Sequence, residues 1–494
     1  MLLAFFIFIR MSPSLIITCF VLYSILLFSI VWVTSRKSNN STFYLGNKSS
    51  PWYVVAYGMI GASLSGVTFM SVPGWVKDTQ FSYLLVIIGY FFGYIVISTV
   101  LLPLYYRMNL TSIYSYLETR FGKYSYKSGS IFFIISRIIG ASFRMFLVVN
   151  VIQTFVFDQW NIPFFFIVFA FLLLVLLFTY KGGIKTIVWT DTLQTTFMII
   201  SVITCIFLIK SDLNLSFTEI IDKAESAGYT KIMFNDWHDK RYFIKQLLSG
   251  MFISIVMTGL DQEMMQKNLS CRNIKDAQKN MISFSIVLIF VNFLFLFLGA
   301  ILYIYTDMKG IEVIGTTDQT FPLVAFNYLG PIIGLSFLIG LISAAYPSAD
   351  GALTSLTTVF CIDILGLNKN TKLTEQQKIN KRYIVHIAFA ILFLFVIVLY
   401  RYINDQAIVG KLFTMAGYTY GPLLGLYFTG LFTKINVKDK LVPLICITSP
   451  IICYILSENS EQLFNGYKFG FELLILNGFI TFLGLLLIKK KRPN

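Results

Sequence analysis

Charge is scarce in this chain, and so are the residue types on which most enzyme chemistry depends. Only 13% of the 494 residues are charged, and the two histidines are His238 and His386. No P-loop, HExxH or GxSxG pattern occurs, so nucleotide hydrolysis, zinc proteolysis and serine-type acyl transfer have no support in the sequence. These absences predict a protein that is not an enzyme, has no catalytic residues and binds no organic cofactor.

The cysteines are few and scattered. They lie mostly inside apolar stretches and include no CxxC pair: Cys19, Cys205, Cys271, Cys361, Cys446 and Cys453. Their spacing predicts neither a disulfide framework nor a cysteine-based metal site.

Long hydrophobic runs, by contrast, recur from one end of the chain to the other. Hydrophobic residues make up 56% of the sequence, and the mean hydropathy is +0.74. A run of about 18 residues or more is long enough to cross a hydrocarbon core as a helix. We therefore predict an all-α membrane protein with about 13 transmembrane helices. The predicted spans are residues 14–34, 52–74, 83–106, 128–156, 163–180, 186–209, 243–263, 281–305, 331–361, 384–402, 408–432, 441–457 and 470–488.

The net charge of +15 raises nucleic-acid binding as an alternative, and the positions of the basic residues argue against it. They concentrate in alternate loops, which include Arg107, Lys185, Lys267, Lys369 and the terminal KKKR, whereas the loop at 211–242 carries six acidic residues. By the positive-inside rule, the N-terminus is outside and the C-terminus is cytoplasmic in a multi-pass cell-membrane protein. The predicted partner is the lipid bilayer, with no nucleic acid and no obligatory protein partner.

Residues 1–10, MLLAFFIFIR, precede a second methionine and are too short to span a membrane. An over-extended start is one interpretation and a signal peptide is the other. The lack of a small-residue cleavage site before the first span favours the over-extended start.

Four acidic residues lie inside or at the end of predicted spans: Asp191, Asp261, Glu263 and Asp350. A charge at the bilayer centre costs several kcal/mol unless it is paired or hydrated, so such residues are candidates for function. Alternatively, each is a helix-end residue whose side chain reaches the membrane surface. That alternative stays fully open for Asp261 and Glu263, and it is less favoured for Asp350, whose helix continues apolar beyond it.

Small and hydroxyl residues interrupt two of the spans. GASLSGVTF (61–69) lies deep in the second span, and 249–259 has a similar composition. Glycine leaves helical geometry at low cost, and hydroxyl groups satisfy the freed backbone, so both stretches predict broken helices. Two broken helices five positions apart predict an inverted repeat that holds solute and ion near the midplane. Close helix packing remains the alternative explanation.

Four segments, in order along the chain, resemble the sodium/solute symporter family: LPLYYRMNLTSIYSYLETRFG (102–122), YKGGIKTIVWTDTLQTTFM (180–198), GLDQEMMQKNLSCRNIKDAQ (259–278) and SAAYPSADGALTSLTTVFCIDIL (343–365). The resemblance implies a LeuT-type five-plus-five inverted repeat with discontinuous helices 1 and 6. It also implies sodium-coupled import of a small organic solute by alternating access, the solute being a sugar, an amino acid or a carboxylate such as sialic acid.

The same resemblance implies the organisation of the chain. Residues 1–40 would carry an extra helix (helix 0), 51–210 the first five-helix repeat, 211–242 an extracellular loop, 243–432 the second repeat, and 433–494 helices 11 and 12 with a basic cytoplasmic tail. A solute-sensing receptor of the same fold is an alternative, disfavoured because such relatives append cytoplasmic domains. A passive channel is also disfavoured, because it needs no pair of interrupted helices with acidic side chains.

The resemblance further implies a sodium site, with sodium as the coupling ion, formed by Gly61, Leu64, Ala344 and Ser348, together with Asp191 and Asp350. Pro347 departs from the family pattern, because it stands where a serine hydroxyl is usual. Asp350 matches a hydroxyl position of a second sodium site in some members, and Asp191 matches the acidic residue of that site. Proline also frees the carbonyl one turn earlier, near Ser343, so the oxygen shell is expected to be rebuilt.

The solute pocket implied by the resemblance contains Ser65, Thr68, Phe69, Arg144, Asp261 and Gln262. Arg144 matches a residue that holds the solute carboxylate in sialic-acid-transporting members, which suits the geometry of a guanidinium group. Asp261 stands where asparagine is common in sugar-transporting relatives. Arg144 and Asp261 could also pair with each other, so the charge of the solute stays open at this point. The number of sodium ions and the oligomeric state stay open too.

Overall fold

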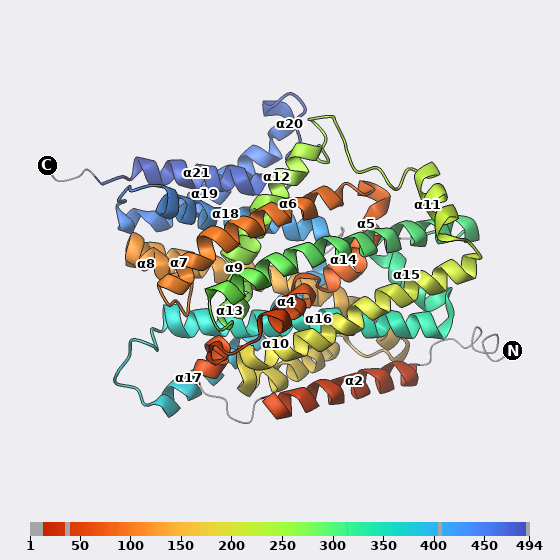
Figure 1. The fold of residues 1–494 in the computed structure, drawn as a ribbon, viewed down its shortest axis with the longest axis horizontal. Coiled ribbons are helices and arrows are strands. Elements are labelled where there is room, and N and C mark those ends of the chain that lie inside the picture. Colours follow the sequence, from red (N-terminus) through yellow and green to blue (C-terminus); the bar gives the residue numbers. More distant parts are fainter. Residues whose placement is uncertain (1–12, 35–39, 314, 404–407, 491–494) are drawn as a thin grey trace.

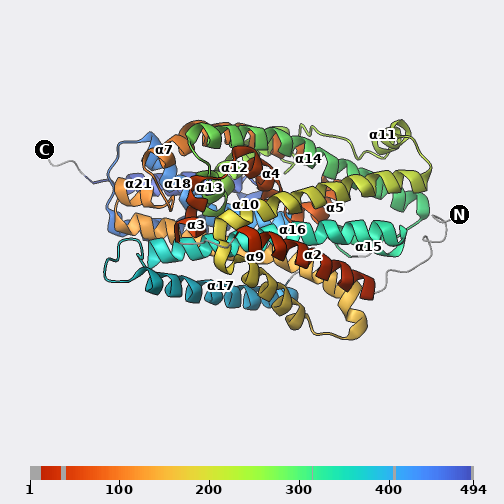
Figure 2. The same cartoon turned by 60° about the horizontal axis from the view of Figure 1, so that its bottom comes forward.

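The computed structural model describes residues 13–34, 40–313, 315–403 and 408–490. Residues 1–10 and the last part of the terminal KKKR lie outside the described residues. The described chain is a bundle of helices, most of which run along the long axis of the molecule (Figures 1 and 2).

The helices of the first half are α2 (Pro13–Thr34), α3 (Asn40–Leu45), α4 (Trp52–Ser63), α5 (Gly66–Thr79), α6 (Tyr83–Val96), α7 (Leu102–Arg107), α8 (Ser115–Arg120), α9 (Lys123–Ile152) and α10 (Phe164–Leu213). Those of the second half are α11 (Phe217–Ser226), α12 (Phe243–Ser254), α13 (Gln262–Leu269), α14 (Ile274–Lys309), α15 (Thr320–Asn327), α16 (Gly330–Val359), α17 (Glu375–Ile403), α18 (Ile408–Phe432), α19 (Val442–Glu458), α20 (Ser460–Leu463) and α21 (Leu473–Leu487).

Every predicted span overlaps one of these helices or two consecutive ones. Among the described residues, eight helices are long and apolar enough to cross a membrane, or up to ten when each bent pair counts as one span. The all-α membrane architecture is thus confirmed. The count of about 13 spans and the five-plus-five repeat stay predictions.

Both predicted interruptions are present. Helices α4 and α5 are bent by 56° at Leu64 and Ser65, and the α12 segment is bent by 65° from α13. Leu64 has φ −88° and ψ 75°, and Ser65 is extended, so the backbone leaves helical geometry for these two residues. At the second interruption, residues 255–259 form a π-helical turn that ends two residues before Asp261. Close helix packing alone does not account for these glycine-rich stretches.

A third break lies inside α10, where Gly183 has φ 52° and ψ −144°. It falls between the predicted spans 163–180 and 186–209, so these two spans are the two parts of α10 on either side of the break. A Cβ atom at Gly183 would lie 2.5 Å from Phe43 Cα. The position thus combines a left-handed backbone with a close approach of α3.

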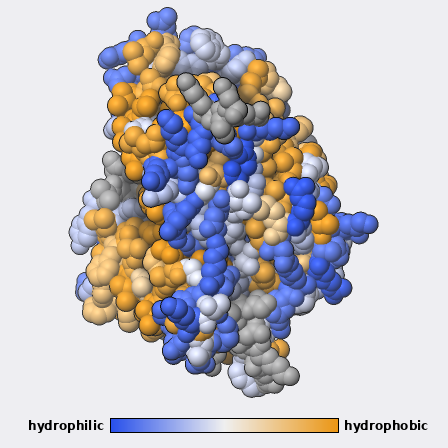
Figure 3. Space-filling model, turned by 90° about the vertical axis from the view of Figure 1, so that its left-hand side faces the viewer, coloured by the Kyte–Doolittle hydropathy of each residue, from blue (hydrophilic) through white to orange (hydrophobic). Residues whose placement is uncertain are grey.

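The surface of the bundle fits a lipid environment. Large exposed hydrophobic residues lie on its long sides, for example Phe166 on α10 and Phe290 on α14. Viewed onto the end that carries α8, hydrophilic side chains run across the face, and hydrophobic ones flank them (Figure 3). The chain is therefore a multi-pass membrane protein. The direction in which it crosses the membrane stays a prediction.

Replacing Gly183 by alanine should destabilise the protein. A left-handed backbone costs a residue with a Cβ about 1–2 kcal/mol, and the contact with Phe43 adds to this cost. Gly310→Ala is the matched control, because Gly310 has φ 63° but a Cβ atom added there would meet no heavy atom within 4 Å. The unfolding free energy, measured by SDS titration in mixed micelles, should fall further for Gly183→Ala. Equal losses of unfolding free energy would show that α3 moves away from the added Cβ atom at no energetic cost.

Candidate functional site

The break between α4 and α5 lies beside α10. A Cβ atom at Gly58 would lie 3.1 Å from the Asp191 Cβ, and one at Gly61 would lie 3.5 Å from the Asp191 carbonyl oxygen. The small residues therefore let α4 approach α10 closely. The carbonyl groups in the last turn of a helix lack intrahelical amide donors. The break thus presents backbone oxygens near Gly61 and Leu64, two predicted sodium ligands, next to α10.

Of the other predicted sodium ligands, Asp191 lies on α10 and the remaining three lie on α16, which contacts both α4 and α10. Ala344, Ser348 and Asp350 are fully buried, and the helix continues through Pro347 without a break. Because proline has no amide hydrogen, the Ser343 carbonyl has no donor from position 347. The structure thus brings the predicted sodium residues of three helices into one region.

Several polar atoms in this region are buried without a hydrogen-bonding partner among the described residues. They are the hydroxyl oxygens of Ser343, Ser348 and Thr354, one oxygen of Asp191 and both carboxylate oxygens of Asp350. Ser343, Pro347, Asp350 and Thr354 follow one another at helical spacing and share one stripe of α16. Sodium is a hard cation that takes several oxygen ligands, so this set of unsatisfied oxygens fits it.

A chain of buried ion pairs lies next to these oxygens. Arg137 on α9 lies 3.5 Å from the Asp261 carboxylate and also pairs with Glu263. Lys267 Nζ lies 3.7 Å from Glu263 Oε1 and 2.6 Å from Asp191 Oδ2. The hydroxyl group of Tyr420 on α18 donates to Asp261 at 2.6 Å. The network therefore joins α9, α10, α13 and α18.

Two interpretations of the sequence are wrong here. Asp261 and Glu263 do not reach the membrane surface, because both are buried and paired with Arg137. Lys267, counted among the basic residues of a cytoplasmic loop, is also buried, with 1% of its surface exposed. The physical reason is that the predicted span ended at residue 263, whereas α13 continues to Leu269 inside the protein.

Sequence reasoning missed Arg137, Glu263 and Lys267 as parts of one site. Glu263 and Lys267 are four residues apart, a spacing that places opposite charges next to each other on a helix. This spacing was the available signal. Nothing in the sequence marked Arg137 as their partner, because that contact joins residues 126 positions apart.

A small cavity of about 80 Å³ lies beside the break and is lined in part by its residues. Ser65, Thr68 and Arg144 line it, as predicted for the solute pocket. The remaining walls carry many hydroxyl and amide groups: Ser63, Tyr83, Tyr90, Tyr94, Ser254, Thr258 and Asn292. Apolar side chains such as Val72, Ile87 and Leu412 complete the lining, so the cavity offers both polar and apolar contacts.

The other predicted solute residues lie away from this cavity. Phe69 packs against Phe295, Phe321 and Phe337, with ring centroids 5.5 to 6.0 Å apart. Gln262 accepts a hydrogen bond from the Ile113 amide and donates to the Thr111 carbonyl. Asp261 caps α13 by accepting from two backbone amides of that helix. Their roles in solute binding stay predictions.

Arg144 differs from Arg137, although both lie on α9 and line the same cavity. Among the described residues, no acidic group lies within ion-pair distance of Arg144, and its Nε atom is buried without a hydrogen-bonding partner. Asp261 pairs with Arg137 and Tyr420 instead of with Arg144. The pocket therefore holds one guanidinium group that is free to meet an anion.

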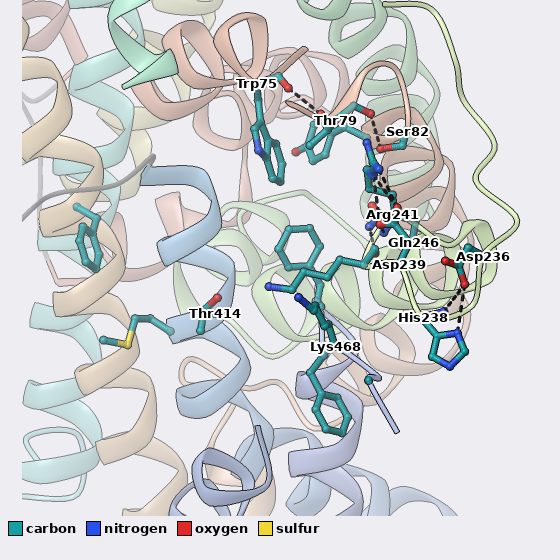
Figure 4. Close-up of a pocket in the computed structure, with 18 of the residues that line it drawn as sticks. Trp75, Thr79, Ser82, Asp236, His238, Asp239, Arg241, Gln246, Thr414 and Lys468 are labelled. Carbon is teal, nitrogen blue, oxygen red and sulfur yellow. Dashed lines mark hydrogen bonds and ion pairs between the residues drawn. The ribbon is translucent and has the colours of Figure 1, made fainter. Parts of the chain in front are cut away.

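A wider cavity of about 1100 Å³, lined in part by exposed loop residues, meets the smaller one at Tyr83 (Figure 4). Charged loop residues line its outer part, where Arg241 pairs with Asp239 at 2.7 Å. The hydrogen bonds from Arg241 lower the pKa of the Asp239 carboxyl. Tyr83 lines both cavities. It lies in an aromatic cluster with Trp75, Phe413 and Phe471 that separates the two.

The family model described as the sodium:solute symporter family matches residues 43–437. The chain belongs to this family. Among its relatives, the symporter is 23% identical to a sodium/sialic acid symporter of Aliivibrio fischeri over 93% of this chain and 90% of that one. It is 25% identical to the sodium-coupled monocarboxylate transporter 2 of Mus musculus, over 82% of this chain and 66% of that one.

The fold of this symporter is similar to that of a solved structure of another protein. That structure is the substrate-bound outward-open state of a Na⁺-coupled sialic acid symporter, and it matches with a TM-score of 0.81 and 20% identity. The likeness covers 96% of this chain and 98% of the other. The LeuT-type fold expected from the sequence is thereby confirmed.

Removing Arg137 should cost far more stability than removing Arg144. Arg137→Met leaves the buried Asp261 without a cation and Glu263 with Lys267 alone, and breaking a buried pair in this way costs about 3–5 kcal/mol. Arg144→Met is the matched control, because it removes the unpaired guanidinium of the same helix and should cost about 1 kcal/mol or less. SDS titration of the two purified variants measures the difference. Equal losses would contradict the pairing described here.

Proposed function

We propose that this symporter imports a small organic carboxylate together with sodium across the cell membrane. The observation that carries this proposal is the unpaired Arg144 guanidinium in the small cavity beside the break. A guanidinium fork matches a carboxylate with two parallel hydrogen bonds. Relatives named for the transport of sialic acid and of monocarboxylates support an acidic solute.

The size of the cavity favours a small acid. A cavity of about 80 Å³ compares with roughly 10–15 Å³ for each water in the same kind of measure. It therefore holds on the order of six waters, or an acid of a few carbon atoms. The hydroxyl groups around it would bind a keto or hydroxyl oxygen next to the carboxylate. A larger sugar acid would need the surrounding helices to move apart.

Sodium, in this proposal, binds between the break of α4 and the polar stripe of α16. The carbonyl groups of Gly61, Leu64 and Ala344, the Ser348 hydroxyl and the Asp350 carboxylate supply oxygen ligands. The ion would offset the Asp350 charge and hold the broken helix in the arrangement that places Ser65 and Thr68 at the solute. Sodium and solute thus favour the same conformation, which is the physical basis of coupling.

The conformation of the bundle supports alternating access from the side of the wide cavity. At the opposite end, Asp363 of the α16 segment accepts hydrogen bonds from Ser112, Tyr126 and Ser130 at 2.6, 2.7 and 3.0 Å. These bonds tie the end of the α16 segment to α9 and to the residues before α8, and in this proposal they keep that end closed. With the N-terminus outside, the wide cavity faces the exterior, and the aromatic cluster around Tyr83 covers the bound solute.

Uptake of pyruvate into proteoliposomes tests the proposal. It should require an inward sodium gradient. One sodium cancels the charge of one monovalent acid, so its driving force is its concentration gradient, and a tenfold gradient, worth about 1.4 kcal/mol, gives about tenfold accumulation. Protein-free liposomes are the control. Equal uptake with choline in place of sodium would contradict sodium coupling, and uptake that never exceeds the external concentration would indicate a channel.

Because of Arg144, the protein should bind an acid in preference to its neutral analogue. In sodium, pyruvate should raise the thermal unfolding midpoint of the purified protein and pyruvamide should not, because a ligand stabilises the state it binds. Arg144→Ala should abolish the shift and Arg144→Lys should restore part of it, since a point charge lacks the planar fork. The shift caused by sodium alone should persist in both variants. An undiminished pyruvate shift in Arg144→Ala would contradict the assignment.

A further inference from the structure

Lys267 places a cation in the protein interior, where the apolar runs of the sequence did not predict one. Its ammonium group is buried between α13 and α10, at 2.6 Å from Asp191 Oδ2 and 3.7 Å from Glu263 Oε1. The lysine therefore binds the same carboxylate that the family resemblance assigns to a second sodium ion.

The buried basic side chains of this region pair with some of its carboxylates and not with others. Arg137 serves Asp261 and Glu263, and Lys267 serves Glu263 and Asp191. Asp350 is the remaining buried acid of this region. Within the described residues it has no basic side chain at ion-pair distance, and its two oxygens find no hydrogen-bonding partner. One buried acid is thus left for an external cation.

The protein oxygens around Asp350 are arranged for such a cation, whereas those around Asp191 are partly taken. Three hydroxyl groups on the same helix as Asp350 are buried without a hydrogen-bonding partner among the described residues. They belong to Ser343, Ser348 and Thr354. At Asp191, an ammonium group already holds one carboxylate oxygen. A second cation on that carboxylate would repel the ammonium at close range in a low-dielectric interior.

We propose that Lys267 is a tethered cation that fills the Asp191 side of the ion region, so that each chain binds one sodium ion, at Asp350, and not two. This inference rests on the proposed function, and it adds the number of ions. Asp191 and Lys267 then hold α10 and α13 together permanently, and the sodium at Asp350 alone comes and goes with the transport cycle.

Equilibrium binding of radioactive ²²Na⁺ to the purified chain in detergent tests this inference without any solute. The unchanged chain should saturate at one sodium per chain. Lys267→Met, which removes the ammonium but keeps a long apolar side chain, should bind two, because sodium can then reach Asp191. Lys267→Arg keeps the positive charge and should bind one.

A charge-neutral double variant separates this role from a purely structural one. Lys267→Met with Asp191→Asn removes both charges, leaves no buried acid unpaired at this position, and should return the count to one. If Lys267→Met alone does not fold, the unchanged chain and the double variant still decide the matter. One sodium in both supports the inference.

Different sodium counts would contradict the proposed function and the single sodium site. Two sodium ions on the unchanged chain would overturn the inference and leave sodium coupling intact. One sodium on a folded Lys267→Met variant would also overturn it, because Lys267 would then not be what excludes the second ion. No sodium on the unchanged chain would overturn the proposed function and the inference together.

Discussion

A charge inside an apolar bundle must find an opposite charge, and this constraint organises the centre of the protein. Arg137 and Lys267 are shared between three carboxylates, and together they tie α9, α10 and α13 around the two broken helices. An unpaired ion would be expensive at this depth, so the network specifies how these helices meet. Arg144 and Asp350, two charged groups next to this network, lie outside these pairs among the described residues, and we propose that they bind an anion and a cation.

Small residues make this arrangement possible. A Cβ atom at Gly351 would lie 2.6 Å from the Glu263 carboxyl carbon, so the glycine after Asp350 is what allows Glu263 to approach α16. Gly58 and Gly61 allow α4 to approach Asp191 in the same way. The glycines near the site thus serve two purposes. Those in α4 and α16 bring charged groups together, and the stretch 61–66 lets the backbone depart from the helix.

The sequence predicted the features that depend on composition and local pattern. Apolar runs placed the helices, and the glycine and hydroxyl residues of 61–69 and 249–259 placed the two breaks. It could not predict which charges pair, because pairing depends on how distant helices pack. Arg137 and Arg144 look alike in the sequence, and the structure alone shows that one is paired and the other is not. The burial of Lys267 was missed because α13 extends beyond the apolar run.

Asp350 is the residue that we propose binds sodium, and a structure determined in the presence of sodium tests this proposal most directly. Difference density between the sodium and choline forms should show one cation that contacts Asp350, Ser348 and the backbone at the break of α4, with Lys267 still on Asp191. No sodium-dependent density near Asp350, or density on Asp191 in place of the Lys267 ammonium, would contradict the account.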